Sequence, residues 1–327
     1  MVLLLLKKPP TKQTVNPLRI GLDLMGSDLG PQRVLEGLNA FIGLGLSAEV
    51  VVYGNMNDHQ NVVDSFGFPE QVTFEHCTES IEMGEHPAKA VMKKTDSSIV
   101  RGFADLKARK IDAFASTGNT GAMMTAAMMS VKTIPGVIRP AIASAIPREN
   151  GKVGLLLDVG ANADCKPDYL FQFGIMGHWY AKTVLGIDSP KVGLINIGEE
   201  EEKGSLLCQA ANKLMKDNHL FDFVGNIEGR DMFSSEVDVM VTDGFTGNVM
   251  LKLAESFYRM IRLRKIEDDF FKKLNYEIYG GSPILGVNGN VIIGHGSSSA
   301  IAIGNMIAQG YHMAQHQLRE KIETAFQ

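Results

Sequence analysis

Short runs of apolar residues alternate along this chain with stretches of helical periodicity, and small polar residues separate the two. Helical patterns cover residues 31–42 and 88–106, a stretch that ends near 274, and the C-terminal region. Strands alternating with helices predict an α/β fold, doubly wound around a mostly parallel sheet. The runs that indicate buried strands are residues 18–24, 49–53, 71–76, 111–115, 140–147, 220–224, 237–241 and 287–293.

The stretch from 155 to 204 carries the most information. It reads as a buried strand, a turn with Asp158, Gly160 and Asn162, a helix, a second strand, and a turn with Lys203. A crossover through a helix predicts a parallel strand pair. Ligands of open α/β sheets bind outside the carboxyl ends of strands. We therefore expect both turns at the carboxyl ends of neighbouring strands, and the polar turns of the chain to converge on one sheet edge.

About six strand-to-helix joins carry Gly, Asn, Asp, Ser or Thr. Such a turn at a helix N-terminus favours an anion, because free N–H groups and the helix dipole point at it. The run Glu199–Glu202 is expected to be a solvated helix start, and Lys203 to contact a bound anion such as phosphate. The turn that contains Lys203 continues with Gly204 and Ser205. The other joins contain Gly118, Asn119, Thr120, Gly121, Asp243, Gly247, Asn248, His295 and Ser297.

Composition narrows the class of protein. With 37 acidic and 32 basic residues the net charge is −5, which gives no support to nucleic-acid binding. The three cysteines show neither a disulfide framework nor metal spacing, so we expect a cytoplasmic protein. Residues 1–17 are predicted to be a disordered extension, because the apolar run 2–6 is too short for a signal peptide. Residues 18–327 are predicted to form one catalytic α/β domain.

Several familiar catalytic patterns are absent from the sequence. G-x-G-x-x-G, the P-loop and G-x-S-x-G do not occur, which disfavours dinucleotide, nucleotide and serine-hydrolase chemistry. The polar turns that remain can bind phosphate, and transfer of an acyl group from a thioester to phosphate is one reaction that suits them, since phosphate is itself the nucleophile. Such a site holds phosphate in line and stabilises the oxyanion with positioned donors. We expect no metal and no organic cofactor.

Seven motifs occur in a fixed order: DLMGSD, STGNTGA, DVGAN, GLINIGEEEEKG, GNIEGRD, DGFTGNVMLK and HGSS. In this order they resemble the phosphate acyltransferase family of bacterial phospholipid synthesis. These enzymes convert acyl-acyl carrier protein and inorganic phosphate into acyl phosphate, an early step towards phosphatidic acid. The resemblance implies a fold similar to phosphotransacetylases and the isocitrate-dehydrogenase-like group.

The resemblance also implies roles for individual residues. Asn119, Asn162, Lys203 and Asn248 become candidates for phosphate and oxyanion contacts. Asp158, Asp243 and His295 become candidate polar or acid/base groups, with Lys203 grouped among the catalytic residues. For each Asp and Asn the alternative role is to cap a helix or hold a turn. The remaining turn residues are expected to line the phosphate site.

The implied partners are acyl carrier protein, phosphate and a second copy of the chain. Residues 255–280 are expected to form a helical segment for dimer contact or for peripheral contact with the inner face of the cell membrane. Two alternatives remain open from sequence: a phosphotransacetylase acting on acyl-CoA, and a non-catalytic protein that binds a phosphate or acyl ligand. A dehydrogenase of the related fold is disfavoured without a dinucleotide fingerprint.

Overall fold

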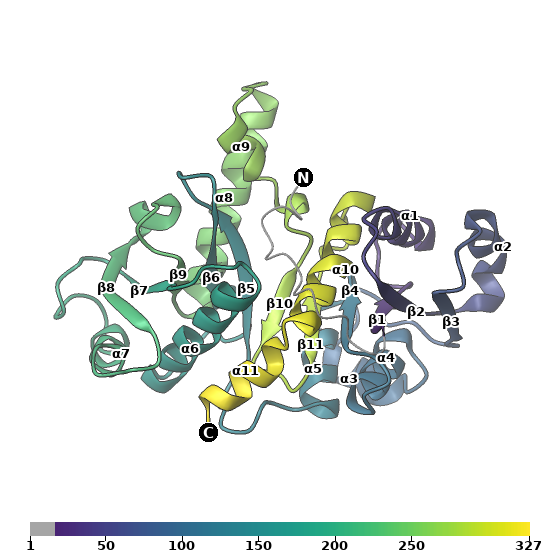
Figure 1. The fold of residues 1–327 in the computed structure, drawn as a ribbon, viewed down its shortest axis with the longest axis horizontal. Coiled ribbons are helices and arrows are strands. Elements are labelled where there is room, and N and C mark those ends of the chain that lie inside the picture. Colours follow the sequence, from purple (N-terminus) through teal and green to yellow (C-terminus); the bar gives the residue numbers. More distant parts are fainter. Residues whose placement is uncertain (1–16) are drawn as a thin grey trace.

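The computed structural model describes residues 17–327, in which eleven strands join in one mixed sheet (Figure 1). Their order is β3-β2-β1-β4-β11-β10-β5-β6-β9-β7-β8. Residues 1–16 of the predicted N-terminal extension lie outside the described residues. The strands are β1 (Leu18–Asp23), β2 (Ala48–Gly54), β3 (Val72–His76), β4 (Ala113–Ser116), β5 (Ala141–Pro147), β6 (Val153–Leu157), β7 (Lys191–Asn196), β8 (Asp222–Glu228), β9 (Val239–Val241), β10 (Ser282–Leu285) and β11 (Asn290–Ile293).

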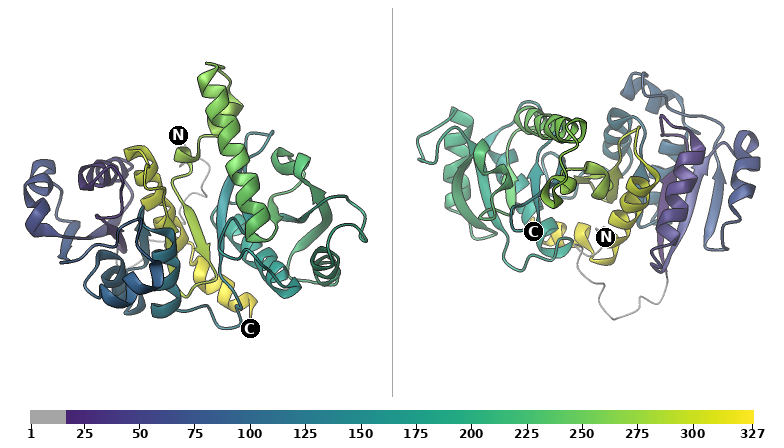
Figure 2. Two further views of the ribbon diagram at one scale, coloured as in Figure 1. Left: turned by 180° about the vertical axis from the view of Figure 1, so that it is seen from behind. Right: turned by 90° about the horizontal axis from the view of Figure 1, so that it is seen from above.

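Helices cover both faces of the sheet (Figure 2). The α-helices are α1 (Pro31–Ile42), α2 (Met56–Phe66), α3 (Pro87–Lys93), α4 (Ser98–Lys107), α5 (Thr120–Ser130), α6 (Pro167–Thr183), α7 (Leu206–Lys216), α8 (Gly244–Leu263), α9 (Asp269–Lys273), α10 (Ala300–Gln315) and α11 (Leu318–Ala325). Two short 3₁₀ helices are η2 (Gly229–Phe233) and η3 (Tyr276–Ile278). The predicted α/β fold with a mostly parallel sheet is confirmed.

The central strands are buried on both faces, which explains why they read as continuous apolar runs. In β4, Ala113 and Ala115 belong to one core cluster and Phe114 to the other. Successive strand side chains point to opposite faces, so each strand feeds both clusters. The first cluster lies beneath α1 and α10, and the second beneath α4 and α5.

The sheet consists of two half-sheets that run in opposite directions. Strands β3, β2, β1, β4 and β11 are mutually parallel, and so are β6, β9, β7 and β8. Between them β10 and β5 pair antiparallel with each neighbour, which reverses the direction. The expectation that all polar turns follow strands at one sheet edge is therefore wrong. The predicted neighbours β6 and β7 are parallel, but β9 lies between them.

Other boundaries differ from the sequence predictions for local reasons. The helix predicted at 31–42 is confirmed as α1. The helix predicted at 88–106 is two helices, because Ser97 leaves the helical conformation and caps α4 by accepting a hydrogen bond from Val100. The strand predicted at 287–293 is the second arm of the β10–β11 hairpin, whose connection uses Gly286 at a φ of 87°. Strand β8 extends four residues beyond the predicted end, to Glu228.

Helices α8 and α9 form an arm that projects beyond the two half-sheets (Figures 1 and 2). Helix α8 begins at Gly244 beside β6 and β9 and runs for 20 residues to Leu263. The long helical pattern predicted to continue to 274 is thus interrupted between α8 and α9. Among residues 17–327, no helix is both long and apolar enough to cross a membrane.

Candidate active site

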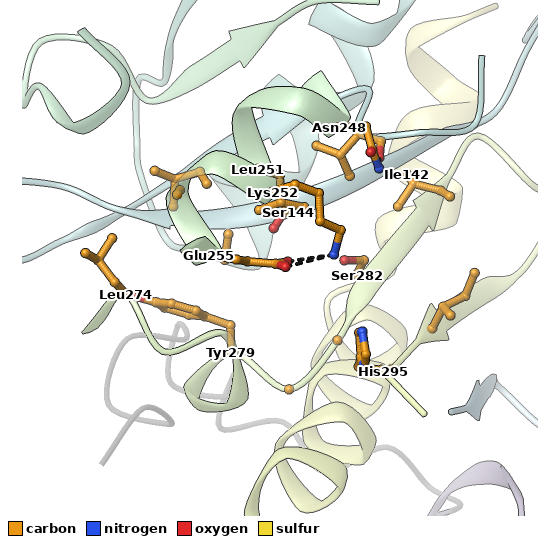
Figure 3. A pocket seen from close by; sticks show the side chains of 18 of the residues that line it. Ile142, Ser144, Asn248, Leu251, Lys252, Glu255, Leu274, Tyr279, Ser282 and His295 are labelled. Carbon is orange, nitrogen blue, oxygen red and sulfur yellow. Dashed lines mark hydrogen bonds and ion pairs between the residues drawn. The ribbon is translucent and has the colours of Figure 1, made fainter. Parts of the chain in front are cut away.

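A cavity of about 320 Å³ lies where the two half-sheets meet. Strand β5 contributes Ile142 and every residue from Ser144 to Pro147 to its lining. Helix α8 forms one wall, and the segment around Tyr279 together with the end of β11 lies opposite (Figure 3). The turns that follow β4, β6, β9 and β11 all reach this cavity, because β5 connects both half-sheets. The polar turns therefore meet at the junction between the two half-sheets.

One lysine supplies positive charge to this cavity. Among residues 17–327, Lys252 is the only lysine or arginine that lines it. Its Nζ lies 2.8 Å from Oε2 of Glu255, and both side chains come from α8 and point towards Ser282 (Figure 3). The Lys252 side chain remains 51% exposed, so a ligand can reach its amine. A lysine amine beside hydroxyl groups is suited to an anionic ligand such as phosphate.

The rest of the lining is largely apolar. Leu251, Leu274, Ile142 and Ile146 all line the cavity. The Tyr279 hydroxyl is buried and makes no hydrogen bond within the described part of the chain, and burial raises the pKa of this phenol. Tyr279 is therefore a protonated donor that a ligand could satisfy. The cavity combines a cationic group with a surface suited to hydrocarbon.

The turn before α5 is built mainly to hold its own loops. Asn119 caps α5 by accepting from the Ala122 N–H, and its Nδ2 donates to the carbonyl oxygens of Glu82, Met83 and Glu85. Gly118 donates its N–H to Ser116 Oγ at 2.9 Å. Gly121 packs against Pro87 at the start of α3. Of the four predicted residues in this turn, only Thr120 lines the cavity.

Asp158 organises the turn after β6. Its fully buried carboxylate accepts hydrogen bonds from the N–H groups of Ile142, Gly160, Ala161 and Asn162, and from Asn162 Nδ2. Burial raises the pKa of Asp158, and these donors oppose the increase by stabilising the charged form. Asn162 Nδ2 also donates to the Pro140 carbonyl, so Asp158 and Asn162 connect β6 to the start of β5.

The start of α8 packs directly on this turn. Asp243 is the N-cap and accepts from the Thr246 N–H and hydroxyl, both at 2.8 Å. A Cβ at Gly247 would collide with the carbonyl oxygen of Asp158, so glycine is required there. Asn248 donates from Nδ2 to the Val159 carbonyl at 3.0 Å and lines the cavity. Asn248 is thus the predicted residue of this motif that reaches the candidate site.

His295 lies at the mouth of the cavity, just after β11. Its Nδ1 is 2.8 Å from Ser297 Oγ, and the imidazole is exposed. His295 lines this cavity, called the inner cavity below. It also lines a second concave surface along α8, called the outer groove, to which Ser297 contributes. This position allows the imidazole to exchange a proton between solvent and a group held in the cavity.

Lys203 does not line the cavity. It lies in the turn between β7 and α7, with an exposed side chain, and its carbonyl accepts from Asn196 Nδ2. Gly204 packs against the same asparagine, and Ser205 caps α7 by accepting from the Cys208 N–H. The adjacent glutamates precede α7 rather than start it: Glu199 pairs with Arg230 and Glu201 with Lys216. The expected helix start at this run is therefore wrong.

Several lining residues lie outside the sequence prediction. They are Lys252, Ser144, Ser282 and Tyr279, although Lys252 is the last residue of the DGFTGNVMLK motif. A signal for Lys252 was available, because it follows Asn248 by four residues and must share its helix face. Ser144 and Ser282 have no comparable signal, since only the pairing of β5 with β10 brings their strands together. Within residues 17–327, no group of three His, Cys, Asp or Glu could hold a metal ion.

Comparison with known proteins points to one family. A family model described as "Fatty acid synthesis protein" matches residues 18–267 and 260–321. A phosphate acyltransferase of Dictyoglomus turgidum is 40% identical, with 93% of this chain and 96% of that protein aligned. A phosphate acyltransferase of Halothermothrix orenii is 41% identical, with 89% of this chain and 93% of that protein aligned.

Solved structures share the fold at low identity. A phosphotransacetylase from Streptococcus pyogenes superposes with a TM-score of 0.64 at 18% identity, covering 91% of this chain and 94% of that one. The EutD phosphotransacetylase from Staphylococcus aureus gives a TM-score of 0.62 at 16% identity, with the same coverage. The predicted likeness in fold to phosphotransacetylases is confirmed.

Proposed function

The chain belongs to the fatty acid synthesis protein family, whose curated relatives are named phosphate acyltransferase, and we propose that its acyl donor is acyl-acyl carrier protein. Inorganic phosphate is the acceptor, and the acyl phosphate produced would serve the acylations that lead to phosphatidic acid. The observation that carries this proposal is the cavity in which Lys252 faces an apolar wall. Such a cavity suits both reactants, an anion and a hydrocarbon chain.

The proposed reaction is a direct displacement. A phosphate oxygen attacks the thioester carbonyl carbon, the C–O bond forms, the C–S bond breaks, and the thiolate leaves with the bonding pair. Lys252 holds phosphate through its amine, while Asn248 and Thr120 at the turns and Ser144 on β5 lie where polar groups can contact the oxyanion. His295 at the mouth supplies a proton to the departing thiolate. Leu251, Leu274 and the isoleucines of β5 accommodate the acyl chain.

The other predicted residues are assigned supporting roles in this proposal. Asp158 and Asn162 fix the β6 turn, Asp243 and Asn119 cap the helices that carry Asn248 and Thr120, and the glycines allow the close packing between them. Lys203, Gly204 and Ser205 form a second polar turn outside the cavity. We retain Lys203 as the competing phosphate ligand, to be separated from Lys252 by substitution.

The proposal is tested by incubating the purified protein with long-chain acyl-acyl carrier protein, with and without phosphate. We expect free carrier thiol and acyl phosphate to appear together, and only with phosphate. Release of thiol without phosphate would indicate a thioesterase. Turnover of acyl-CoA without turnover of the carrier-protein thioester would replace the proposed donor by acyl-CoA. Ligand-induced thermal stabilisation with no turnover of either thioester would indicate a binding protein.

We also infer that α8 pairs with a second copy of the chain. Large apolar side chains recur every three or four residues along one side of α8, and monomers seldom expose such a continuous stripe. Their exposed fractions range from 49% at Phe257 to 67% at Phe245. This apolar stripe consists of Phe245, Val249, Leu253, Phe257 and Met260.

Substituting Leu253→Glu is expected to convert a dimer into a monomer, because it places two carboxylates in the centre of the interface. Sedimentation velocity measures the change, and circular dichroism checks that the helix content is retained. Met129→Glu is the matched control, since Met129 is similarly exposed, at 53%, on α5. A wild-type protein that sediments as a monomer, or a Leu253→Glu dimer, would contradict the inference.

The outer end of the arm is proposed as a peripheral membrane contact. Leu263 and Ile266 are 72% and 51% exposed there, beside Arg264 and Lys265. Apolar side chains next to cations favour binding to anionic lipid surfaces. Flotation with anionic and with neutral vesicles measures this contact, and equal recovery with both would contradict an electrostatic contribution.

A further inference from the structure

A second concave surface continues outward from the cavity along α8. This outer groove, of about 760 Å³, is lined by Lys252, Glu255, Ser256, Tyr258, Arg259, Arg262, Leu263, His295 and Ser297. It shares Lys252, Glu255 and His295 with the inner cavity, so the two spaces are adjacent. A molecule that lies in the outer groove can therefore present a group to the inner cavity.

The outer groove carries uncompensated positive charge. Arg259 and Arg262 take part in no ion pair within the described residues. The only carboxylate that the described residues contribute to the lining, that of Glu255, is already engaged by Lys252 at 2.8 Å. The chain as a whole has a net charge of −5, so the positive charge of this lining is opposite in sign to that of the whole chain. The lining of the groove is thus suited to binding a negatively charged surface of a partner molecule.

We propose that the outer groove is the docking surface for the acidic face of the carrier protein that bears the acyl thioester. The inference rests on the proposed function, because it assigns the donor a place beside the same site. Arg259 follows Lys252 by seven residues and Arg262 by ten, which places them about 10 and 15 Å farther along the helix axis. A protein docked on the two arginines would direct a prosthetic arm towards Lys252.

The position of the arginines favours a protein donor over lipid. Both line the groove that opens towards His295, whereas Ile266 and its flanking cations lie beyond the end of α8. Complementary charge accelerates encounter and fixes orientation, and this effect weakens with added salt. Carrier docking at the groove therefore contributes to KM and to the salt dependence of kcat/KM, while bond making depends on the inner cavity.

The test is the charge reversal Arg259→Glu/Arg262→Glu, assayed with long-chain acyl-acyl carrier protein and with the same acyl chain on pantetheine. We expect KM for the carrier-protein substrate to rise by about 10- to 100-fold, with kcat changed less than about twofold and the salt dependence largely abolished. Turnover of acyl-pantetheine should be unchanged, because it has no acidic protein to dock. Arg259→Lys/Arg262→Lys should restore most of the affinity for the carrier.

The matched control is Lys107→Glu/Lys213→Glu, which changes the net charge equally at exposed lysines on α4 and α7. It should leave both substrates unaffected. If wild type uses acyl-acyl carrier protein but Arg259→Glu/Arg262→Glu keeps its KM, docking is overturned and the proposed function stands. If wild type fails with that donor, the proposed function itself fails.

Two further results would overturn the proposal. An equal rise in KM for acyl-CoA would mean that the groove binds a phosphate group common to both donors instead of the carrier protein. Loss of binding to anionic vesicles with an unchanged KM would assign Arg259 and Arg262 to a lipid surface. The melting temperature of each variant must match wild type within a few degrees, and the acyl-pantetheine rate checks that the inner cavity is intact.

Discussion

Replacing Lys252 with methionine is expected to lower kcat/KM by about 10²–10³-fold, while Lys203→Ala changes it by less than about threefold. Removal of one electrostatic contact to a transition state has effects of this size. Within the described part of the chain, Lys252 is the only lysine or arginine lining the inner cavity, and methionine keeps most of its apolar stem. The measurement is steady-state formation of acyl phosphate with phosphate as the varied substrate.

The partner of Lys252 supplies the control. Lys252→Met leaves the Glu255 carboxylate unpaired beside the phosphate site, where it would itself repel the anion. The double variant Lys252→Met/Glu255→Gln removes that repulsion, and we expect it to remain at least about tenfold below the Glu255→Gln single variant. A large loss of kcat/KM with Lys203→Ala and none with Lys252→Met would show instead that Lys203 contacts phosphate, as the sequence predicts.

Replacing Asp158 with alanine is expected to reduce the free energy of unfolding by at least about 4 kcal/mol. The change removes the acceptor of five hydrogen bonds, four of them from backbone N–H groups in a buried turn. Each buried donor left unsatisfied costs about 1–3 kcal/mol, partly relieved by water entering the site. Denaturant unfolding followed by circular dichroism measures the loss.

Asp243→Ala is the matched comparison for this stability prediction. Asp243 also ends a strand and binds local backbone, but it caps α8 with two hydrogen bonds at a half-buried position. Loss of such a cap costs about 1 kcal/mol. An Asp158→Ala protein as stable as wild type yet inactive would show that Asp158 acts in catalysis, as the sequence resemblance implies.

Much of the fold could be read from the sequence because its strands are buried on both faces. In β2, Val50 and Val52 belong to one core cluster and Val51 and Tyr53 to the other, so four successive positions are buried. The β10–β11 hairpin was not predicted, since its arms are only four residues each and Pro283 interrupts the first. The order of the strands could not be predicted from local sequence patterns either. Strand β9 lies between β6 and β7 because it pairs with strands that are distant from it in the sequence.

For the candidate site, the sequence located the polar turns but could not rank them. The sequence alone does not distinguish Asn119 and Asp158 from residues that bind a ligand. In the structure, their side chains form hydrogen bonds to other parts of the chain. Thr120, Asn248 and His295 come from the same motifs and do reach the cavity. The difference is the direction of each side chain, which depends on loops far away in sequence, such as the one whose carbonyls Asn119 binds.

By itself, then, the sequence determined the alternation of strands and helices, the family, and the motifs from which a site is built. These depend on residue type and spacing within a few helical turns or one strand. Only the tertiary structure decided that the two half-sheets run in opposite directions, that their turns meet at β5, and that Lys252 rather than Lys203 lies in the cavity they enclose. The physical reason is that strand pairing and cavity lining also depend on contacts between residues far apart in the sequence, as in the pairing of Ile142 with Ile284.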